Sequence, residues 1–261
     1  MARRDLVEPS NPPRIGCVQY LNARPLIRGW QGGVCLDSPA VLCAKLAGGE
    51  LDAALVSSFE FLRNPVYRIV DDISIASAGA VYSVFVAHRG PLSESKEIVL
   101  DPASETSVNL LRCLLAERGL PPRLVPAADA TDPDGARLLI GDQAIRFRQS
   151  HPDFNYWDLG EEWRKAFDLP FVYALWLIRP EVPDASALAD RLRALRDANL
   201  AHLDQLIAEE KSFDSDFCRT YYRDHVRLYF GEREKEGLRV FRTLCAKHEL
   251  LPAREIELSV V

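Results

Sequence analysis

The chain has 261 residues, of which 48% are hydrophobic and 27% charged, and these proportions are typical of a folded globular protein rather than a disordered one. Its length favours one large domain or two modest ones. The 32 Lys and Arg residues against 38 Asp and Glu give a formal net charge of −6. This balance argues against nucleic acid or an anionic membrane as the main partner, whereas a small anionic ligand needs only a few well-placed donors.

The sequence indicates neither export nor metal binding. The N-terminal residues lack the apolar stretch of a secretory signal, and no apolar run approaches the roughly 18 residues needed to span a bilayer. The 6 cysteines include no pair at the spacing of metal ligands, and the 5 histidines lie apart from one another. We therefore expect a cytoplasmic protein that holds no metal and whose cysteines are reduced and buried.

The first part of the chain alternates short apolar segments with helix signals. Strands are predicted at residues 14–18, 34–37 and 51–56. Ser38 and Pro39 are typical of a helix start, and Gly48 ends that helix. A further short helix is expected after Ser57. This alternation predicts a largely parallel sheet within an α/β layer structure.

A second series of the same kind follows between two long apolar stretches. One stretch covers residues 73–87 and the other residues 171–178. Between them the pattern predicts a helix from about Thr106 to Arg118 and short strands at residues 98–100, 124–126 and 136–140. After Pro183 the pattern becomes helical and amphipathic.

The order of these elements predicts two α/β lobes with mixed sheets flanked by helices. Residues 1–88 and 179–261 would form the first lobe, and residues 89–178 would form a second lobe inserted into it. The long apolar strands at residues 81–87 and 171–178 would be the crossings between the lobes. A ligand is then expected in the cleft between them, where helix N-termini from both lobes converge.

Small polar residues at predicted strand ends are the candidate ligand contacts. Ser104, Thr106 and Ser107 open a predicted helix, so their hydroxyls and backbone N–H groups could hold an anion. The alternative is that they are ordinary N-caps. Two other strand ends carry similar pairs, Ser57-Ser58 and Gly141-Asp142.

Three further residues need an explanation of another kind. Ser83 stands in an apolar predicted strand, where a buried hydroxyl must find a protein or ligand partner. Tyr20 and Asn22 follow the first strand and are either a helix entry or ligand contacts. Tyr221-Tyr222 is interpreted as core or lobe packing.

Several ordered segments resemble the chorismate dehydratases of the futalosine route to menaquinone. The resemblance covers about residues 14–180 and more loosely the helical tail. It rests on the segments Tyr20-Leu-Asn-Ala-Arg-Pro-Leu26, Leu51-Asp-Ala-Ala-Leu-Val-Ser-Ser58, Ala80-Val-Tyr-Ser-Val84, Ser104-Glu-Thr-Ser107, Leu139-Ile-Gly-Asp142 and Leu169-Pro-Phe-Val-Tyr-Ala-Leu-Trp176.

The resemblance implies a type II periplasmic-binding-protein fold used for catalysis. The family converts chorismate, a small dicarboxylate, to 3-[(1-carboxyvinyl)oxy]benzoate and water without a cofactor, so the chain would be a hydro-lyase. Loss of the C3 hydrogen and the C4 hydroxyl makes the ring aromatic. No histidine or carboxylate stands at a motif position as an obvious base, and our hypothesis is that the enolpyruvyl carboxylate of the substrate removes the proton.

The resemblance also implies roles for the candidate residues. Asn22 and Ser83 would be catalytic, and substrate would be bound by Tyr20, Ser57, Ser58, Ser104, Thr106, Ser107, Gly141 and Asp142. The family often has Pro at the position of Ser57 and a polar residue at that of Phe59, which puts the contact from the first lobe in doubt. The competing interpretation is a cytosolic sensor of the same fold that binds a small acid without catalysis.

Overall fold

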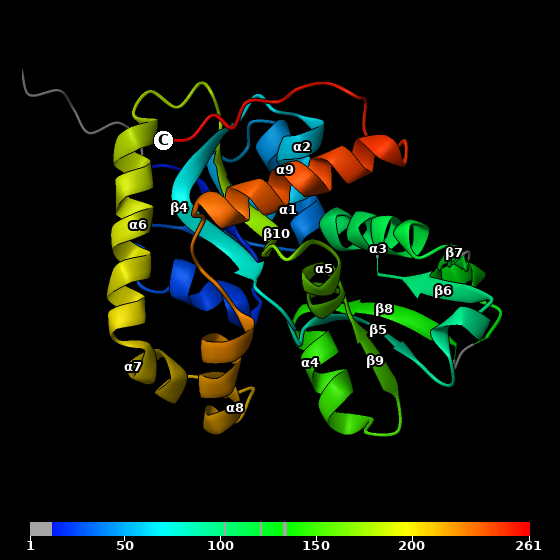
Figure 1. Cartoon of the computed structure of the whole chain (residues 1–261). Helices are drawn as coiled ribbons and strands as arrows, with labels where there is room; N and C mark the ends of the chain where they lie inside the picture. The colour runs from blue at the N-terminus through cyan, green and yellow to red at the C-terminus, as the bar shows by residue number, and fades with distance from the viewer. Residues whose placement is uncertain (1–11, 102, 121, 133–134) are drawn as a thin grey trace, which may run out of the picture.

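The computed structural model describes residues 12–101, 103–120, 122–132 and 135–261, and in it the chain forms two lobes, each built on a five-stranded sheet (Figure 1). The first sheet has the strand order β2-β1-β3-β10-β4. Its strands β1 and β2 are parallel, as are β1 and β3, whereas β10 runs antiparallel to both of its neighbours. The strands are β1 (Ile15–Cys17), β2 (Val34–Leu36), β3 (Ala53–Ser57), β4 (Arg68–Ser77) and β10 (Phe171–Ile178).

The second sheet has the order β7-β6-β8-β5-β9. Here β6 is parallel to β7 and β8, and β5 is antiparallel to β8 and β9. Both sheets are therefore mixed, and in each a single antiparallel strand lies beside the parallel ones. The strands are β5 (Val84–His88), β6 (Glu97–Leu100), β7 (Arg123–Pro126), β8 (Ala136–Ile140) and β9 (Asn155–Asp158).

Helices cover both sheets, and the C-terminal ones return to the first. Among them, α6 packs on β4, and α9 contacts both β10 and α3. The α-helices are α1 (Pro39–Ala47), α2 (Ser58–Arg63), α3 (Glu105–Glu117), α4 (Gly141–Ser150), α5 (Leu159–Phe167), α6 (Ala185–Ala201), α7 (Leu203–Ala208), α8 (Ser215–Thr220) and α9 (Glu232–Lys247). The shorter turns are the 3-10 helices η1 (Leu21–Leu26), η2 (Leu92–Glu94) and η3 (Ala127–Asp129) and the π-helix η4 (Tyr221–His225).

The two crossings between the sheets differ from the sequence prediction. The chain passes to the second sheet through residues 78–83 and returns after α5, so β5 lies in the second sheet and β10 in the first. The predicted lobe boundaries at residues 88 and 178 are therefore wrong for these strands, because they assign β5 to the first lobe and β10 to the second. The apolar pattern hides the break because it continues into the first crossing, where Val81 is only 2% exposed. Residues 1–11 of the predicted first lobe lie outside the described residues.

Asp158 joins the outward crossing to the start of α5. Its carboxylate accepts hydrogen bonds from the backbone N–H groups of Val81 and Tyr82 at 3.0 and 2.8 Å, and also from those of Gly160 and Glu161 at 3.1 and 3.2 Å. The first pair belongs to the outward crossing and the second to the start of α5. One buried side chain therefore caps a helix and fixes the point at which the lobes meet.

One hydrophobic core runs through both lobes. The buried cluster includes Val56 and Trp176 from the first sheet and Ile98 and Leu138 from the second. A smaller cluster covers the other face of the second sheet, around Phe85. In the described part of the chain, no helix is long and apolar enough to cross a membrane.

Candidate active site

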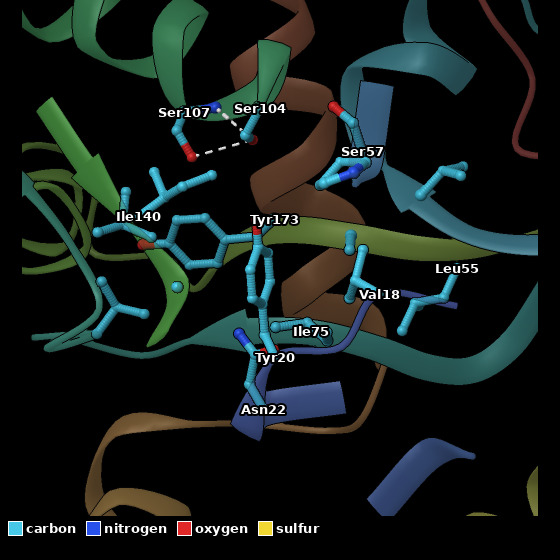
Figure 2. Close-up of a pocket in the computed structure, with 16 residues that line it drawn as sticks. Val18, Tyr20, Asn22, Leu55, Ser57, Ile75, Ser104, Ser107, Ile140 and Tyr173 are labelled. Atoms are coloured by element: carbon cyan, nitrogen blue, oxygen red, sulfur yellow. Dashed lines mark hydrogen bonds between the residues drawn. The ribbon is translucent and has the colours of Figure 1, made fainter. Parts of the chain in front are cut away.

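A cavity of about 60 Å³ lies between the two sheets, with residues from both lobes in its wall (Figure 2). Its apolar wall is formed mainly by Val18, Leu55, Ile75, Val81, Val84 and Ile140. Its polar groups come from the ends of strands and helices: Tyr20, Asn22, Ser57, Ser104, Ser107 and Tyr173. An apolar wall with a few convergent polar groups is typical of a site for a small organic ligand.

Tyr20 and Asn22 come from the start of η1. Tyr20 is the residue before the first turn, and in Figure 2 its ring lies at the centre of the cavity. Burial, with Asp101 and Asp142 nearby, raises the pKa of Tyr20 to about 12, so its hydroxyl remains a hydrogen-bond donor at neutral pH. The Oδ1 atom of Asn22 is buried and has no hydrogen-bond partner among the described residues. A buried acceptor without a partner is costly unless a ligand or water satisfies it.

Ser104 and Ser107 form the opposite side of the cavity at the N-terminus of α3. The Oγ atom of Ser104 accepts a hydrogen bond from the backbone N–H of Ser107 at 3.3 Å, and the two hydroxyl oxygens lie 3.2 Å apart. Ser104 is thus an N-cap, as the alternative interpretation expected. Both serines also line the cavity, so capping and ligand contact are compatible at this helix end.

Thr106 and Ser58 do not line the cavity, contrary to their expected role as substrate contacts. Thr106 Oγ1 accepts a hydrogen bond from the backbone N–H of Phe59 at 3.0 Å and is also bonded to the Ser57 hydroxyl. In return, Ser57 Oγ accepts from the backbone N–H of Thr106 at 3.1 Å. Ser58 donates to the carbonyl oxygen of Val172 at 2.7 Å. The hydroxyls of Thr106 and Ser57 therefore cap α2 and α3 across the interface between the lobes, and of the three residues only Ser57 also reaches the cavity.

Ser83 lies in the turn before β5 rather than within a strand, and it is completely buried. Its Oγ lies 2.8 Å from the hydroxyl oxygen of Tyr221, a residue of η4. The neighbours Val81 and Val84 line the cavity, whereas Ser83 is behind them. The partner that a buried hydroxyl requires is thus a tyrosine of the C-terminal region.

Gly141 and Asp142 begin α4 and contact the η1 region of the first lobe. Gly141 lines the cavity with φ +62°, and a Cβ added to it would lie 2.9 Å from ring atoms of Tyr20. Asp142 does not line the cavity. Its carboxylate instead accepts a hydrogen bond from the backbone N–H of Leu21 at 2.8 Å. Burial raises the pKa of Asp142, and that hydrogen bond opposes the shift. Asp142 thus links the lobes rather than contacting a ligand in this cavity.

Sequence reasoning missed Tyr173, which lines the cavity from β10. Its hydroxyl oxygen lies 3.3 Å from Ser77 Oγ, and burial raises the pKa of Tyr173 well above its ordinary value. A phenol in an otherwise apolar strand was the available signal. Tyr221 was also missed as a partner of site residues, because it is 138 positions from Ser83.

The lining carries no formal charge. Among the described residues around the cavity there is no Lys, Arg, His, Asp or Glu. Over the chain as far as it is described, no group of three or more His, Cys, Asp or Glu side chains is placed to hold a metal ion. An anionic ligand would therefore be bound by neutral hydroxyl, amide and backbone donors.

Comparisons with known proteins agree with this description. Residues 13–247 match the sequence model of a family described as menaquinone biosynthesis. The chain is 31% identical to the chorismate dehydratase of Thermus thermophilus, over 88% of this chain and 94% of that protein.

Two solved structures show the same fold at low identity. A protein of Archaeoglobus fulgidus superposes with a TM-score of 0.66 at 16% identity, covering 92% of this chain and 98% of that one. The periplasmic aliphatic sulphonate binding protein of Escherichia coli gives a TM-score of 0.63 at 13% identity, with 94% and 90% covered. With a periplasmic-binding-protein fold, a cleft between its lobes and a match over most of its length, the chain belongs to the menaquinone biosynthesis family.

Proposed function

We propose that the chain is a chorismate dehydratase that forms 3-[(1-carboxyvinyl)oxy]benzoate and water on the futalosine route to menaquinone. The observation that carries the proposal is the 31% identity to the Thermus thermophilus chorismate dehydratase over 94% of that protein. The cavity supports it, because an apolar wall suits a six-membered ring and the polar groups stand at its two sides.

The polar groups are assigned by the chemistry of the substrate. Ser104, Ser107 and the backbone N–H groups at the start of α3 are donors suited to one carboxylate. The hydroxyls of Tyr20 and Tyr173 stay protonated and are donors from the first lobe. Donors aimed at the ring carboxylate would stabilise the negative charge that develops when the C3 proton leaves.

The substrate supplies the base in this proposal. The lining, as far as the structure describes it, contains no side chain that titrates near neutral pH. The enolpyruvyl carboxylate is held beside the C3 hydrogen and can remove it when the protein fixes the geometry. The C4 hydroxyl then leaves, the ring becomes aromatic, and no cofactor is required. The reaction is that of a hydro-lyase.

Substrate entry requires the lobes or the Tyr20 ring to move. A cavity of about 60 Å³ holds only a few water molecules. A second, open cavity lies on the outer side of Tyr20, lined also by Arg24, Asp101, Asp142 and Arg146. Tyr20 lines both cavities, so we assign it the role of a partition between the entrance and the reaction chamber.

The second candidate function is a sensor that binds a small acid without catalysis. It is favoured by the fold shared with the sulphonate binding protein, whose TM-score is 0.63. A cytoplasmic location and a small-molecule partner, without nucleic acid or membrane, are common to both proposals and stay predictions.

One assay separates the two functions. Purified protein is incubated with chorismate, and ultraviolet absorbance is followed for an aromatic product, with and without a metal chelator. A dehydratase yields the product at the same rate in both samples. Absence of turnover, together with tight binding of another small acid by calorimetry, would contradict the proposal and favour the sensor.

A further inference from the structure

The backbone of Leu21 is held on both sides by residues that are distant in the sequence. Its N–H donates to the carboxylate of Asp142 at 2.8 Å, and its carbonyl oxygen accepts from the hydroxyl of Tyr222 at 2.6 Å. The two partners are 121 and 201 positions away from Leu21. Both hydrogen bonds have a defined direction, because a backbone N–H only donates and a carbonyl oxygen only accepts.

The local sequence explains why these bonds come from elsewhere in the chain. Leu21 is the first residue of η1, so its N–H has no acceptor within the helix, and the side chain of Tyr20 provides no cap. In an α-helix the carbonyl oxygen of Leu21 would accept from residue 25, but Pro25 has no N–H. Leu21 is completely buried, so solvent does not replace the missing partners. Asp142 and Tyr222 thus supply two hydrogen bonds that the turn cannot make by itself.

Leu21 stands between two residues that line the cavity. Its N–H belongs to the planar peptide group shared with Tyr20, and its carbonyl belongs to the one shared with Asn22. Figure 2 shows both neighbouring side chains extending from the same turn into the cavity. The Oδ1 atom of Asn22 has no hydrogen-bond partner among the described residues, so no bond of its own holds this atom in place. The position of the backbone is therefore important for both side chains.

We propose that Asp142 and Tyr222 are positioning residues, which fix the peptide groups on the two sides of Leu21. Through these groups they place the Tyr20 ring and the Asn22 amide in the cavity. The proposal rests on the proposed dehydratase function and deepens it, since neither positioning residue lines the cavity. Asp142 belongs to α4 of the second lobe and Leu21 to η1 of the first. Their hydrogen bond forms only when the lobes are close together, so closure of the lobes completes the site.

Amide hydrogen exchange tests the hold on Leu21 without any substrate, by NMR of isotopically labelled protein. In Asp142→Ala the N–H of Leu21 loses its acceptor, so its exchange rate should rise by about tenfold or more. Asp142→Asn keeps a side-chain oxygen that accepts the same hydrogen bond, and its rate should stay within about threefold of the wild-type value. Asp184→Ala is the matched control, because Asp184 also accepts a backbone N–H, that of Ala187 at 3.0 Å, but does so at the start of α6.

Steady-state kinetics test the effect on the reaction. Asp142→Ala and Tyr222→Phe should each lower kcat for chorismate by about tenfold or more, because the side chains that they place are no longer held in a reactive geometry. Asp142→Asn should keep kcat within about threefold of the wild-type value. The inhibition constant of the product should change by less than about threefold in all three variants, since the donors at the start of α3 are untouched. A loss of stability alone would leave the kcat of the folded enzyme unchanged.

The matched control for Tyr222→Phe is Tyr156→Phe. It also removes a phenol hydroxyl that donates to a backbone carbonyl, that of His151, but Tyr156 does not line the cavity and has no bond to η1. Tyr156→Phe should change neither kcat nor the inhibition constant of the product.

Three results would overturn the proposal. These are an unchanged exchange rate of Leu21 in Asp142→Ala, a kcat of Asp142→Ala or Tyr222→Phe within about twofold of the wild type, or an Asp142→Asn variant as impaired as Asp142→Ala. The last result would assign the effect to the charge of Asp142 instead of its hydrogen bond. If Tyr222→Phe does not fold, the comparison of Ala and Asn at position 142 decides alone. A wild type that does not convert chorismate contradicts the proposed function itself, and this outcome is distinct because the exchange rates do not depend on turnover.

Discussion

Gly141 shows how a single backbone position shapes the cavity. Its φ of +62° lies in the left-handed region, and an added Cβ would meet the Tyr20 ring at 2.9 Å. Gly119, after α3, has a nearly equal φ of +64°, but an added Cβ there would meet nothing within 4 Å. The two glycines share the conformational requirement and differ only in what lies beside them.

This difference predicts separate effects on stability and activity. Gly141→Ala and Gly119→Ala should each lower the free energy of unfolding by about 1–2 kcal/mol, because both force alanine into the left-handed region. Only Gly141→Ala should also lower kcat/KM for chorismate, by about tenfold or more, since it displaces Tyr20. Chemical denaturation and steady-state kinetics measure the two effects. Equal activities of the two variants would contradict the role given to Gly141.

At the scale of elements, the N-termini of α2 and α3 cap each other across the lobe interface. Thr106 accepts from the backbone N–H of Phe59, and Ser57 accepts from that of Thr106, at 3.0 and 3.1 Å. Thr106 is completely buried. Its hydroxyl therefore satisfies a helix end that would otherwise be left without a partner in the core.

We expect Thr106→Val to lower the free energy of unfolding by about 1–3 kcal/mol, because the N–H of Phe59 loses its acceptor. Thr243→Val is the control, since Thr243 is exposed and its hydroxyl donates only to the carbonyl oxygen of Arg239 within α9. The free energy of unfolding of Thr243→Val should stay within about 0.5 kcal/mol of the wild-type value. Urea denaturation measures both. A Thr106→Val variant as stable as the control would show that the mutual capping contributes little.

Glu97 in β6 ties together the outer edge of the second lobe. It is paired with Arg123 of β7 at 2.9 Å and accepts the backbone N–H groups of Thr131 and Asp132 at 2.6 and 3.2 Å. The Arg123 guanidinium and these N–H groups lower the pKa of Glu97 from 4.5 to about 2. The ionised carboxylate is thus favoured by the folded state.

A carboxyl whose pKa is lower in the folded state stabilises the protein at pH values above its unfolded-state pKa. This stabilisation is lost as the pH falls toward the folded-state pKa. The Glu97→Gln variant should accordingly be less stable than the wild type at pH 7, and the difference should shrink between about pH 4.5 and pH 2. Thermal unfolding over this range tests it, with the exposed Glu94→Gln as control. A stability difference that does not depend on pH would rule out the ion pair as its cause.

Elements and turns were predictable where local chemistry decides them. Ser38 and Pro39 mark the start of α1, and polar residues at strand ends led to Tyr20, Asn22, Ser57 and Ser104, which all line the cavity. The signals are local because caps and strand ends use neighbouring residues.

Contacts between lobes could not be predicted in the same way. The polar side chains of Ser58, Thr106 and Asp142 have the composition of ligand contacts, but folding gives them protein partners. Thr106 and Asp142 accept backbone N–H groups of the opposite lobe, and Ser58 donates to a carbonyl oxygen of its own lobe. Ser83 meets Tyr221 across 138 positions. The crossing through residues 78–83 is as apolar as the strands around it, so hydrophobicity alone did not reveal where the chain changes sheet.

At the scale of the whole molecule, the described structure has its lobes in close contact. One core runs through both sheets, and Asp142 and Thr106 join the lobes from opposite sides of a cavity of about 60 Å³. A ligand that fills this cavity contacts both lobes at once. Ligand binding should therefore stabilise the entire chain.

The product of the proposed reaction should raise the free energy of unfolding by about 2.7 kcal/mol at a concentration one hundred times its dissociation constant. Thermal unfolding with increasing product concentration measures this effect. Benzoate, which has the ring and one carboxylate only, is the control and should shift the unfolding temperature less at equal concentration. Equal shifts from both compounds would argue against a site for two carboxylates.

The most direct test of the central claim is the conversion of chorismate by the wild type and by Asn22→Ala, with the product identified by mass spectrometry. We predict that the wild type forms an aromatic product lighter than chorismate by one water molecule. Asn22→Ala should lose at least about 100-fold in rate while keeping its fold by circular dichroism. Asn155→Ala, at the exposed first residue of β9, should retain full activity. An inactive wild type, or an Asn22→Ala variant as active as the wild type, would contradict the account.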